Sequence, residues 1–305
     1  MNRSFTAAES DAGQRLDVFL TEKLAPLTRS HVQKLIKDGM VSVDGTPAKG
    51  NRRLKSGETV EAEIPEPKEA EILPEDIPLE ILYEDDDVIL INKPKGLVVH
   101  PAAGHEEGTL VNALMHHCGD GLSGINGVMR PGIVHRIDRD TTGVMIACKN
   151  DLAHNSIAEQ LKEHSSTRRY RALVSGVLKE DEGTVDAPIG RDPANRKKMK
   201  SNVPNGKRAV THYRVLERFR TATYVECVLE TGRTHQIRVH MASIGHPVLG
   251  DQVYGPAKNP YHLEGQTLHA MVLGFRHPRT GEYMEFTAPL PAYFSKLLET
   301  FTKQE

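Results

Sequence analysis

The sequence is poor in features that would mark an exported or membrane protein. Its three cysteines, Cys118, Cys148 and Cys227, lie far apart and fit neither a disulfide framework nor a zinc site. No apolar run is long enough to span a bilayer, and residues 1–10 lack the basic and apolar segments of a signal peptide. We therefore expect a globular protein of the cytoplasm, with no membrane contact and with buried thiols.

The charge is nearly balanced over the whole chain but unevenly distributed. The net charge is −2, which at first argues against a nucleic-acid partner. Residues 61–87, however, contain 12 acidic side chains and a single lysine, so they carry −11 and leave +9 for the rest of the chain. Because phosphate binding depends on the local field rather than on the total charge, this composition permits a nucleic-acid partner.

The sequence pattern predicts two modules joined by an acidic linker. Residues 14–64 form the small first module, in which Thr28 caps a basic helix that ends at Gly39. The Pro- and Glu-rich residues 65–78 form the linker. In residues 79–303, hairpin-linked strands alternate with helices, which predicts an α+β domain with a mixed, largely antiparallel central sheet.

Reactive side chains are densest in residues 131–143, PGIVHRIDRDTTG, which precede an apolar strand. A carboxylate stands there among three basic side chains: Asp138 with His135, Arg136 and Arg139. A carboxylate oriented by cations can act as a nucleophile or as a base, but the same charges also suit a salt-bridge network that stabilises a loop. The local sequence leaves both interpretations open.

A second cluster, residues 230–240 (ETGRTHQIRVH), follows a strand and opens an amphipathic stretch. A turn at Gly232 can direct Arg233 and nearby backbone N–H groups toward an anion. That anion is either an RNA phosphate or the Asp138 carboxylate. The two histidines of the cluster lie five residues apart, which is poor spacing for a shared metal ion, so we expect no metal here.

Two further stretches are basic. Residues 168–171 (RRYR) place Tyr170 among arginines, which suits base stacking with backbone contact or, alternatively, a tyrosine that faces the core. Residues 191–208 contain seven lysines and arginines and are typical of an exposed loop that contacts RNA.

In combination, these motifs resemble those of the RluA-type RNA pseudouridine synthases. Residues 135–143 are similar to the family signature HRLDxxTSG, with two conservative departures, and residues 232–240 are similar to the second signature. Tyr170 begins a segment similar to the one that holds the family's active-site tyrosine, and residues 92–101 (NKPKGLVVHP) are also typical. The first module resembles the small RNA-binding domain shared by a ribosomal small-subunit protein and tyrosyl-tRNA synthetase.

Within this family the sequence is most similar to the RluD branch, which modifies large-subunit ribosomal RNA. The resemblance implies an enzyme that isomerises uridine to pseudouridine in structured RNA. It implies ribosomal RNA as the partner, free or within a pre-ribosomal particle, and it points to no obligate protein partner. It also implies no cofactor, because the isomerisation has no net redox change and no group donor. Accordingly, the sequence lacks the strand, glycine loop and helix of a Rossmann or Walker nucleotide site.

The resemblance further implies roles for single residues. Asp138 is the covalent catalyst, which attacks the ribose or the base, Arg233 pairs with Asp138, and Tyr170 packs on the target base. Arg136 fills the space that the extruded uridine leaves. Substrate contacts are expected from the other polar residues of the two signatures as well: Arg136, His135, Arg139, Thr142, His235 and Arg238. The surface that binds the rest of the RNA is predicted to include Arg29, Lys34, Lys37, Arg52, Arg53, Arg196, Lys197 and Lys198.

Other functions compete with this interpretation. A pseudouridine synthase that acts on tRNA would share all of these motifs. A non-catalytic RNA-binding factor for ribosome assembly would keep the basic module but would not need Asp138, Tyr170 and Arg233 together. A hydrolase would need a suitably placed nucleophilic serine or cysteine, and a kinase would need an aspartate directly after Arg136; the sequence has neither.

We predict that deletion of residues 1–64 weakens RNA binding more than it damages the active site. The basic helix of this module should neutralise RNA phosphates, so its loss should make the salt dependence of the dissociation constant shallower. Binding titrations over a range of salt concentrations measure this slope. An unchanged slope would contradict a role for the module in binding RNA.

Overall fold

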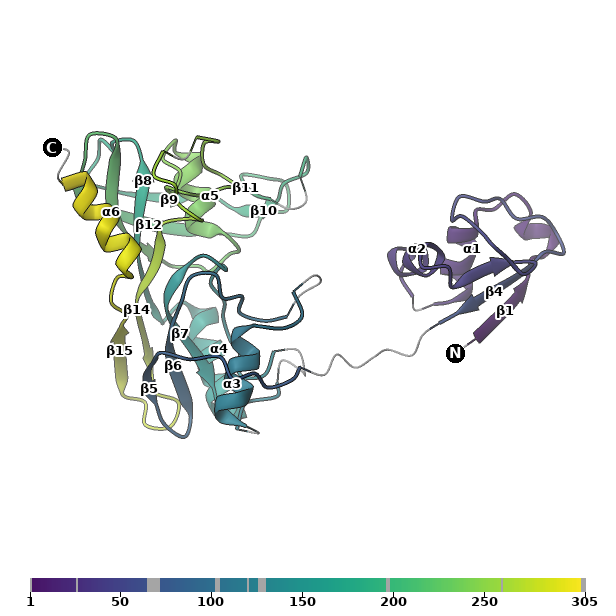
Figure 1. The fold of residues 1–305 in the computed structure, drawn as a ribbon, viewed down its shortest axis with the longest axis horizontal. Helices are drawn as coiled ribbons and strands as arrows, with labels where there is room; N and C mark the ends of the chain where they lie inside the picture. The colour runs from purple at the N-terminus through teal and green to yellow at the C-terminus, as the bar shows by residue number, and fades with distance from the viewer. Residues whose placement is uncertain are drawn as a thin grey trace. The chain divides into compact units, whose positions relative to one another are not determined.

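The computed structural model describes residues 2–25, 27–64, 72–101, 105–119, 121–125, 130–195, 198–258 and 260–302. The chain divides into two compact units, Met1–Ala70 and Glu71–Glu305 (Figure 1). Among the described residues, none of the helices combines the length and the apolar character that a membrane crossing requires.

The first unit is a small antiparallel sheet packed against two helices. The strands run in the order β1 (Asn2–Thr6), β4 (Thr59–Glu63), β2 (Val41–Val43) and β3 (Thr46–Pro47). The helices are α1 (Leu16–Lys23) and α2 (Arg29–Lys37), after a short 3-10 turn at Glu9–Asp11. Thr28 caps α2 by accepting the backbone N–H of His31, as the sequence predicted, and Phe19, Val32 and Val60 meet in the core.

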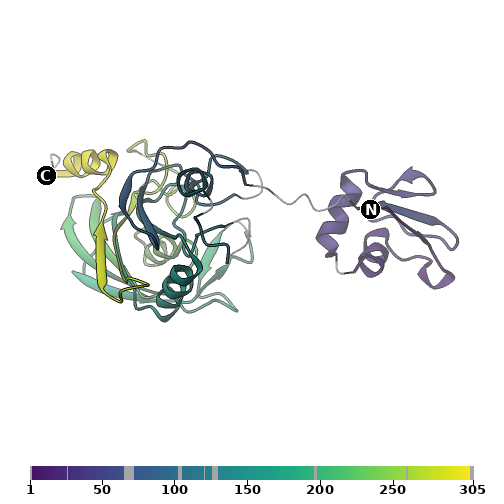
Figure 2. The ribbon, with the colours of Figure 1, turned by 90° about the horizontal axis from the view of Figure 1, so that it is seen from below.

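The second unit is built on one large sheet (Figure 2). Its strands run in the order β5 (Ile81–Glu84), β6 (Val88–Lys93), β7 (Thr142–Cys148), β14 (Leu268–Arg276), β8 (Thr167–Ser175), β13 (Ala222–Leu229), β12 (Val210–Arg218) and β9 (Glu182–Asp186), and β15 (Tyr283–Thr287) also pairs with β14. The pairs between neighbours are antiparallel, except that β14 runs parallel to β7. The predicted α+β fold with a mixed, largely antiparallel sheet is confirmed. Strands β10 (Ile189–Arg191) and β11 (Met199–Ser201) form a separate hairpin.

Helices cover both faces of this sheet. On the β6–β7 half, α3 (Leu110–Cys118) packs against Ile91 and Met145, whereas α4 (Asp151–Glu163) packs against Leu90 and Ile146. Because neighbouring residues of a strand point to opposite faces, the two helices lie on opposite sides. On the other half, α5 (Gln236–Ser243) and α6 (Ala292–Thr302) are divided in the same way, since α5 packs on Ala172 and Val174 and α6 on Leu173.

Strand β14 joins the two halves of the sheet. It pairs with β7 on one side and with β8 on the other. The Tyr170 ring, on β8, packs against both the apolar cluster under α3 and the one under α5. The clusters of the two halves therefore meet on the face of the sheet that carries α3 and α5. The predicted site residues must come together on this face if they come together at all.

The boundaries of the units differ from those that the sequence predicted. The first unit includes residues 2–6, which we had left outside the module, because β1 pairs with β4 along its whole length. At the other end, the predicted linker extends to residue 78, yet Ile72 is buried in the core of the second unit and Glu75 accepts the backbone N–H of Gly108. Residues 65–71 lie outside the described part of the chain.

Candidate active site

The loop that carries Asp138 is fixed at both of its ends. On the β7 side, Gly143 has a φ of +109°, and a Cβ atom there would lie 2.1 Å from the Ala270 carbonyl oxygen, so only glycine allows β14 to approach. The His135 Nε2 accepts the backbone N–H of Ile146 at 3.1 Å. Burial lowers the pKa of His135 to about 4, so the ring is neutral at pH 7 and can accept this hydrogen bond.

A buried lysine holds the same loop from beneath. The Lys93 ammonium donates to the carbonyl oxygens of Pro94, Leu97 and Arg139 at 2.7–2.9 Å. Three acceptors match the three donors of an ammonium group. Burial lowers the pKa of Lys93 to about 7. Lys93 thus ties the loop after Asp138 to the turn that follows β6.

Asp138 is held by one arginine, which is itself held by a second carboxylate. Arg238 Nη1 donates to Asp138 Oδ2 at 2.8 Å. Its Nε and Nη2 bind the two oxygens of Asp251 at 2.7 and 2.9 Å. Such a bidentate ion pair fixes the plane of a guanidinium. The side chains of Arg238 and Asp251 are 6% and 0% exposed, against 17% for Asp138, so only Asp138 offers its carboxylate to the cleft.

The hydrogen bonds and charges that link Asp138, Arg238 and Asp251 shift the pKa values of Arg238 and Asp251. Burial opposes the charge on Arg238, but the hydrogen bonds that it donates to Asp251 and the charges of Asp138 and Asp251 outweigh burial and raise the arginine's pKa. Burial also opposes the charge on Asp251, yet Arg238 and the backbone N–H groups of Val253 and Tyr254 hold the pKa of this carboxyl below its ordinary value. Removing one partner would leave a buried charge without compensation, at a cost of about 3–5 kcal/mol.

An aromatic ring and a histidine complete the surroundings of Asp138. The Tyr254 ring lies 5.2 Å from the Arg238 guanidinium carbon. Its hydroxyl is 2.8 Å from His235 Nδ1. His235 Nε2 lies 3.7 Å from Asp138 Oδ1. Burial lowers the pKa of His235, although the neighbouring Asp138 charge opposes this shift. The backbone of His235 is left-handed, with a φ of +57°, a conformation that is costly for histidine and is often found at functional sites.

Asp138 lies between two cavities of about 400 and 500 Å³. Both are lined by Arg136, Asp138, His235 and Arg238. The larger cavity is also lined by Tyr170. Burial raises the pKa of Tyr170, so its hydroxyl keeps its proton at neutral pH. The structure therefore brings a carboxylate and a tyrosine from distant parts of the chain to one cleft.

Two of the predicted site residues have other roles. The Asp138 carboxylate pairs with Arg238, and the prediction that it pairs with Arg233 is wrong. Arg233 lines the larger cavity, but its Nε donates to the Arg208 carbonyl oxygen at 2.9 Å, because the turn before α5 directs it away from the carboxylate. The prediction that Thr142 contacts the substrate is also wrong. This side chain is buried in β7, 2.7 Å from His269 Nδ1.

The remaining predicted contacts divide into free and engaged side chains. Arg136 is exposed at the rim of both cavities. Arg139 lines the smaller cavity and pairs with Asp140 at 3.1 Å. In the first unit, Lys34 and Lys37 are exposed on α2. Others have partners, namely Arg29 with Asp17, Arg52 with Glu58 and Arg53 with the Gly13 carbonyl. Lys198 is half-buried, and Arg196 and Lys197 lie outside the described residues.

The residues that support Asp138 could hardly be recognised in the sequence. Asp251 and Tyr254 belong to no motif that we recognised, and nothing in their spacing connects them to Arg238. Lys93 lies in the segment 92–101, which we noted as typical of the family without assigning a role to the lysine. A buried lysine or aspartate is recognised only when the fold is known, because its burial depends on contacts distant in sequence.

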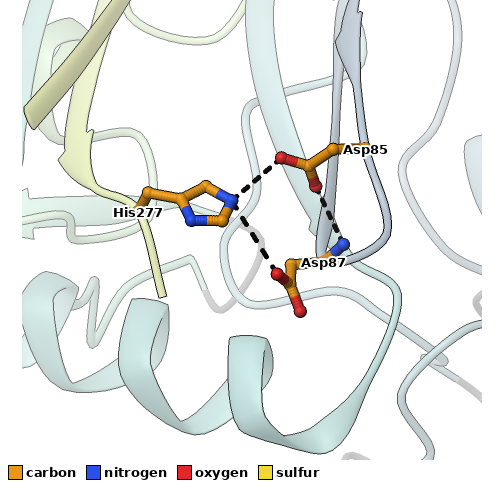
Figure 3. Close-up of side chains that lie close together, drawn as sticks. All are labelled: Asp85, Asp87 and His277. Carbon is orange, nitrogen blue, oxygen red and sulfur yellow. Dashed lines mark hydrogen bonds and ion pairs between the residues drawn. The ribbon is translucent and has the colours of Figure 1, made fainter. Parts of the chain in front are cut away.

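In the described part of the chain, one group of acidic and histidine side chains is close enough to hold a metal ion. Asp85, Asp87 and His277 join the β5–β6 turn to the β14–β15 turn (Figure 3). His277 Nδ1 accepts the backbone N–H groups of Arg279 and Thr280, so Nε2 carries the proton and donates to Asp85 at 2.9 Å. Arg279 binds both oxygens of Asp87. These contacts occupy the ligand atoms, and we interpret the cluster as a structural link between the two turns.

Comparison with known proteins assigns a class to this cleft. The family model for RNA pseudouridylate synthase matches residues 87–243, and the model for the S4 domain matches residues 14–60. An enzyme of this class is an isomerase that acts on RNA. The chain belongs to the RNA pseudouridylate synthase family, in its RluA-type branch, and carries an S4 domain before the catalytic unit.

Several relatives match nearly the whole chain. The uncharacterized RNA pseudouridine synthase YlyB of Bacillus subtilis is 54% identical, over 98% of this chain and 97% of its own. The ribosomal large subunit pseudouridine synthase D of Zymomonas mobilis is 48% identical, over 94% and 93% of the two chains. Among solved structures, human RNA pseudouridylate synthase domain containing 1 has a TM-score of 0.59 at 25% identity, and it covers 78% of this chain and 97% of its own.

We predict that Arg238→Lys lowers the rate of pseudouridine formation by about ten- to hundredfold, the range expected for loss of charge-assisted hydrogen bonds. A lysine cannot form a bidentate pair with Asp251 and also donate a hydrogen bond to Asp138. Arg233→Lys is the matched control, and it should lose much less. Single-turnover rates at saturating RNA measure both. A larger loss from the Arg233 variant would contradict the geometry described above.

His135 predicts a defined pH dependence of stability. Its pKa is about 4 in the folded protein, against 6.5 ordinarily, so between these values the unfolded chain binds a proton that the folded protein does not. The contribution of His135 to the free energy of unfolding should therefore be highest above pH 6.5. It should fall by roughly 2–3 kcal/mol as the pH is lowered to 4. His135→Gln keeps an acceptor for Ile146 but cannot titrate. Denaturant unfolding from pH 4 to 7 should show a shallower pH dependence for this variant, and equal slopes would refute the assignment.

Proposed function

We propose that the protein isomerises specific uridines in structured large-subunit ribosomal RNA, with Asp138 as the covalent catalyst. The observation that carries the mechanism is the placement of Asp138, which is fixed by Arg238 and open to a cleft that Tyr170 also lines. The RNA class is supported by relatives named ribosomal large subunit pseudouridine synthase D, in Zymomonas mobilis and, at 46% identity, in Pseudomonas aeruginosa. Such a role places the protein in the cytoplasm and in ribosome biogenesis.

The proposed reaction conserves every atom of the nucleotide. Asp138 forms a covalent bond to the ribose or to the base, and the bond between N1 and C1′ breaks. The uracil turns, a bond forms between C5 and C1′, and the bond to Asp138 breaks, which releases its carboxylate. C5 loses its proton, and N1 gains one. Attack by a carboxylate held at a fixed distance avoids much of the entropic cost of bringing the two reactants together. No redox partner or group donor is needed for this balance.

The other residues of the cleft act by position. Tyr170 packs on the uracil, and its protonated hydroxyl can donate a hydrogen bond to the base as it turns. Arg136, exposed at the rim of both cavities, takes the place of the uridine in its stack, as a planar guanidinium can. A uridine within a helix or loop must be extruded before its glycosidic bond can be reached, and the S4 domain would hold the surrounding RNA meanwhile.

We predict that Asp138→Asn abolishes pseudouridine formation while folding and RNA affinity stay near those of the wild type. The amide keeps the shape of the carboxyl group but is not a carboxylate nucleophile. Pseudouridines are mapped in ribosomal and transfer RNA from cells that lack the protein and from the same cells supplied with the wild type, with Asp138→Asn, or with Asp186→Asn. The last variant removes an exposed carboxylate on β9 and should restore modification fully.

The pattern of restored sites decides between the candidate functions. Sites that return in large-subunit ribosomal RNA only with an intact Asp138 support the proposal. Sites that return in transfer RNA alone would replace the proposed substrate but keep the mechanism. Full restoration by Asp138→Asn would refute Asp138 as the catalyst. If no site depends on the protein in either RNA, the proposed substrate is wrong.

A further inference from the structure

The larger cavity beside Asp138 has a second polar region, which the proposed chemistry does not use. It is centred on Arg168 of β8, two residues before Tyr170. Successive side chains of a strand point to opposite faces, so Arg168 and Tyr170 share a face and both line this cavity. The Arg168 side chain is deeply buried, with 7% of the residue exposed.

Arg168 is a buried cation without an acidic partner among the described residues. Its Nη2 donates to the Glu230 backbone carbonyl oxygen at 2.9 Å, and its Nε is buried without a hydrogen-bond partner. The carboxylate of Glu230 lies elsewhere, 2.7 Å from Arg208 Nη2 and 2.8 Å from His212 Nε2. Burial lowers the pKa of Arg168. A guanidinium kept in this state costs stability, which suggests that a ligand supplies the missing negative charge.

More positive charge surrounds the mouth of this region. Lys162 and His164, at the C-terminal end of α4, line the same cavity as Arg168, and so does Arg233 of the turn before α5. Burial lowers the pKa of His164, and the positive charges of Arg168 and Arg233 lower it further. The end of α4 and the turn before α5 thus both contribute positive charge to this cavity.

Gly232 gives Arg168 the space that it occupies. A Cβ atom added to Gly232 would lie 2.8 Å from Arg168 Nη1. The backbone of this glycine is not in the left-handed region, so its conformation is open to any residue. An alanine at position 232 would therefore move the Arg168 guanidinium without removing its charge. Gly232→Ala thus tests the position of this charge separately from its presence.

We propose that Arg168, Arg233 and Lys162 form a subsite for one backbone phosphate of the RNA, next to the uridine that is isomerised. This inference rests on the proposed function. A guanidinium with free N–H groups in a positive pocket suits a phosphate. Arg168 and Tyr170 are two residues apart on a strand, which separates their Cα atoms by roughly 6–7 Å. That separation is comparable to the distance from a base to the phosphates of its own nucleotide. A uracil packed on Tyr170 therefore brings a neighbouring phosphate to Arg168.

The test neutralises single phosphates in the RNA. A transcript that contains a mapped target uridine is made with one methylphosphonate at each flanking position in turn. Each is compared with the 2′-deoxy phosphodiester at the same position. For the wild type, one neutral linkage should weaken binding by about ten- to hundredfold, as loss of charge-assisted hydrogen bonds predicts. Arg168→Gln should bind the unmodified RNA about as weakly as the wild type binds the RNA with the neutral linkage. The neutral linkage should cause no further loss of affinity for this variant.

Two further variants make the result specific. Gly232→Ala keeps every charge but displaces the Arg168 guanidinium, so it should reproduce the loss seen with Arg168→Gln, and it serves as the test if that variant does not fold. Arg169→Gln is the matched control. Arg169 is the next residue of β8, faces the opposite side of the sheet and pairs with Glu285. It should show the wild-type response to every methylphosphonate.

Stability measurements separate a ligand contact from a structural role. Because Arg168 is an uncompensated buried charge, Arg168→Gln should melt at the same temperature as the wild type or higher. A marked fall in melting temperature, with the same methylphosphonate response as the wild type, would overturn the proposal. It would also be overturned if no linkage distinguished the two proteins. Either result leaves the proposed function intact, since that fails only if Asp138→Asn stays active or if no RNA is modified.

Discussion

The active site depends on the position of one guanidinium. Arg238 binds Asp251 with two nitrogens and offers a third to Asp138, so the carboxylate that we propose as the catalyst takes its orientation from this arginine. The Tyr254 ring, 5.2 Å away, supports the same group. These paired charges orient Asp138, and a shift of the α5 helix would move its carboxylate as well.

The loop before β7 is constrained just as tightly from the other direction. Lys93 satisfies three carbonyl groups, His135 accepts a backbone N–H, and Gly143 lets β14 approach. They hold Asp138 in place, which suits the reaction that we propose for it.

Much of this arrangement could be predicted from the sequence, and the rest could not for physical reasons. Helix caps such as Thr28, the apolar strands and the hairpins are local features, so they were visible in the pattern of residues. The resemblance of residues 135–143 to a family signature pointed to Asp138. The partner of Asp138 was assigned to Arg233 instead of Arg238, because two arginines five residues apart look alike until the turn and the start of α5 are placed. Asp251, which decides between them, lies 113 residues beyond Asp138 in the chain.

The position of β14 in the sheet has a consequence for the way the enzyme is made. Asp138 precedes β7, Tyr170 lies on β8, and in the sheet β14 lies between these two strands and pairs with both, although it follows both of them in the chain. Closing such distant contacts is slow and carries an entropic cost. A growing chain can therefore form both halves of the sheet and still have no catalytic cleft. The cleft is complete only when β14 has paired with both strands.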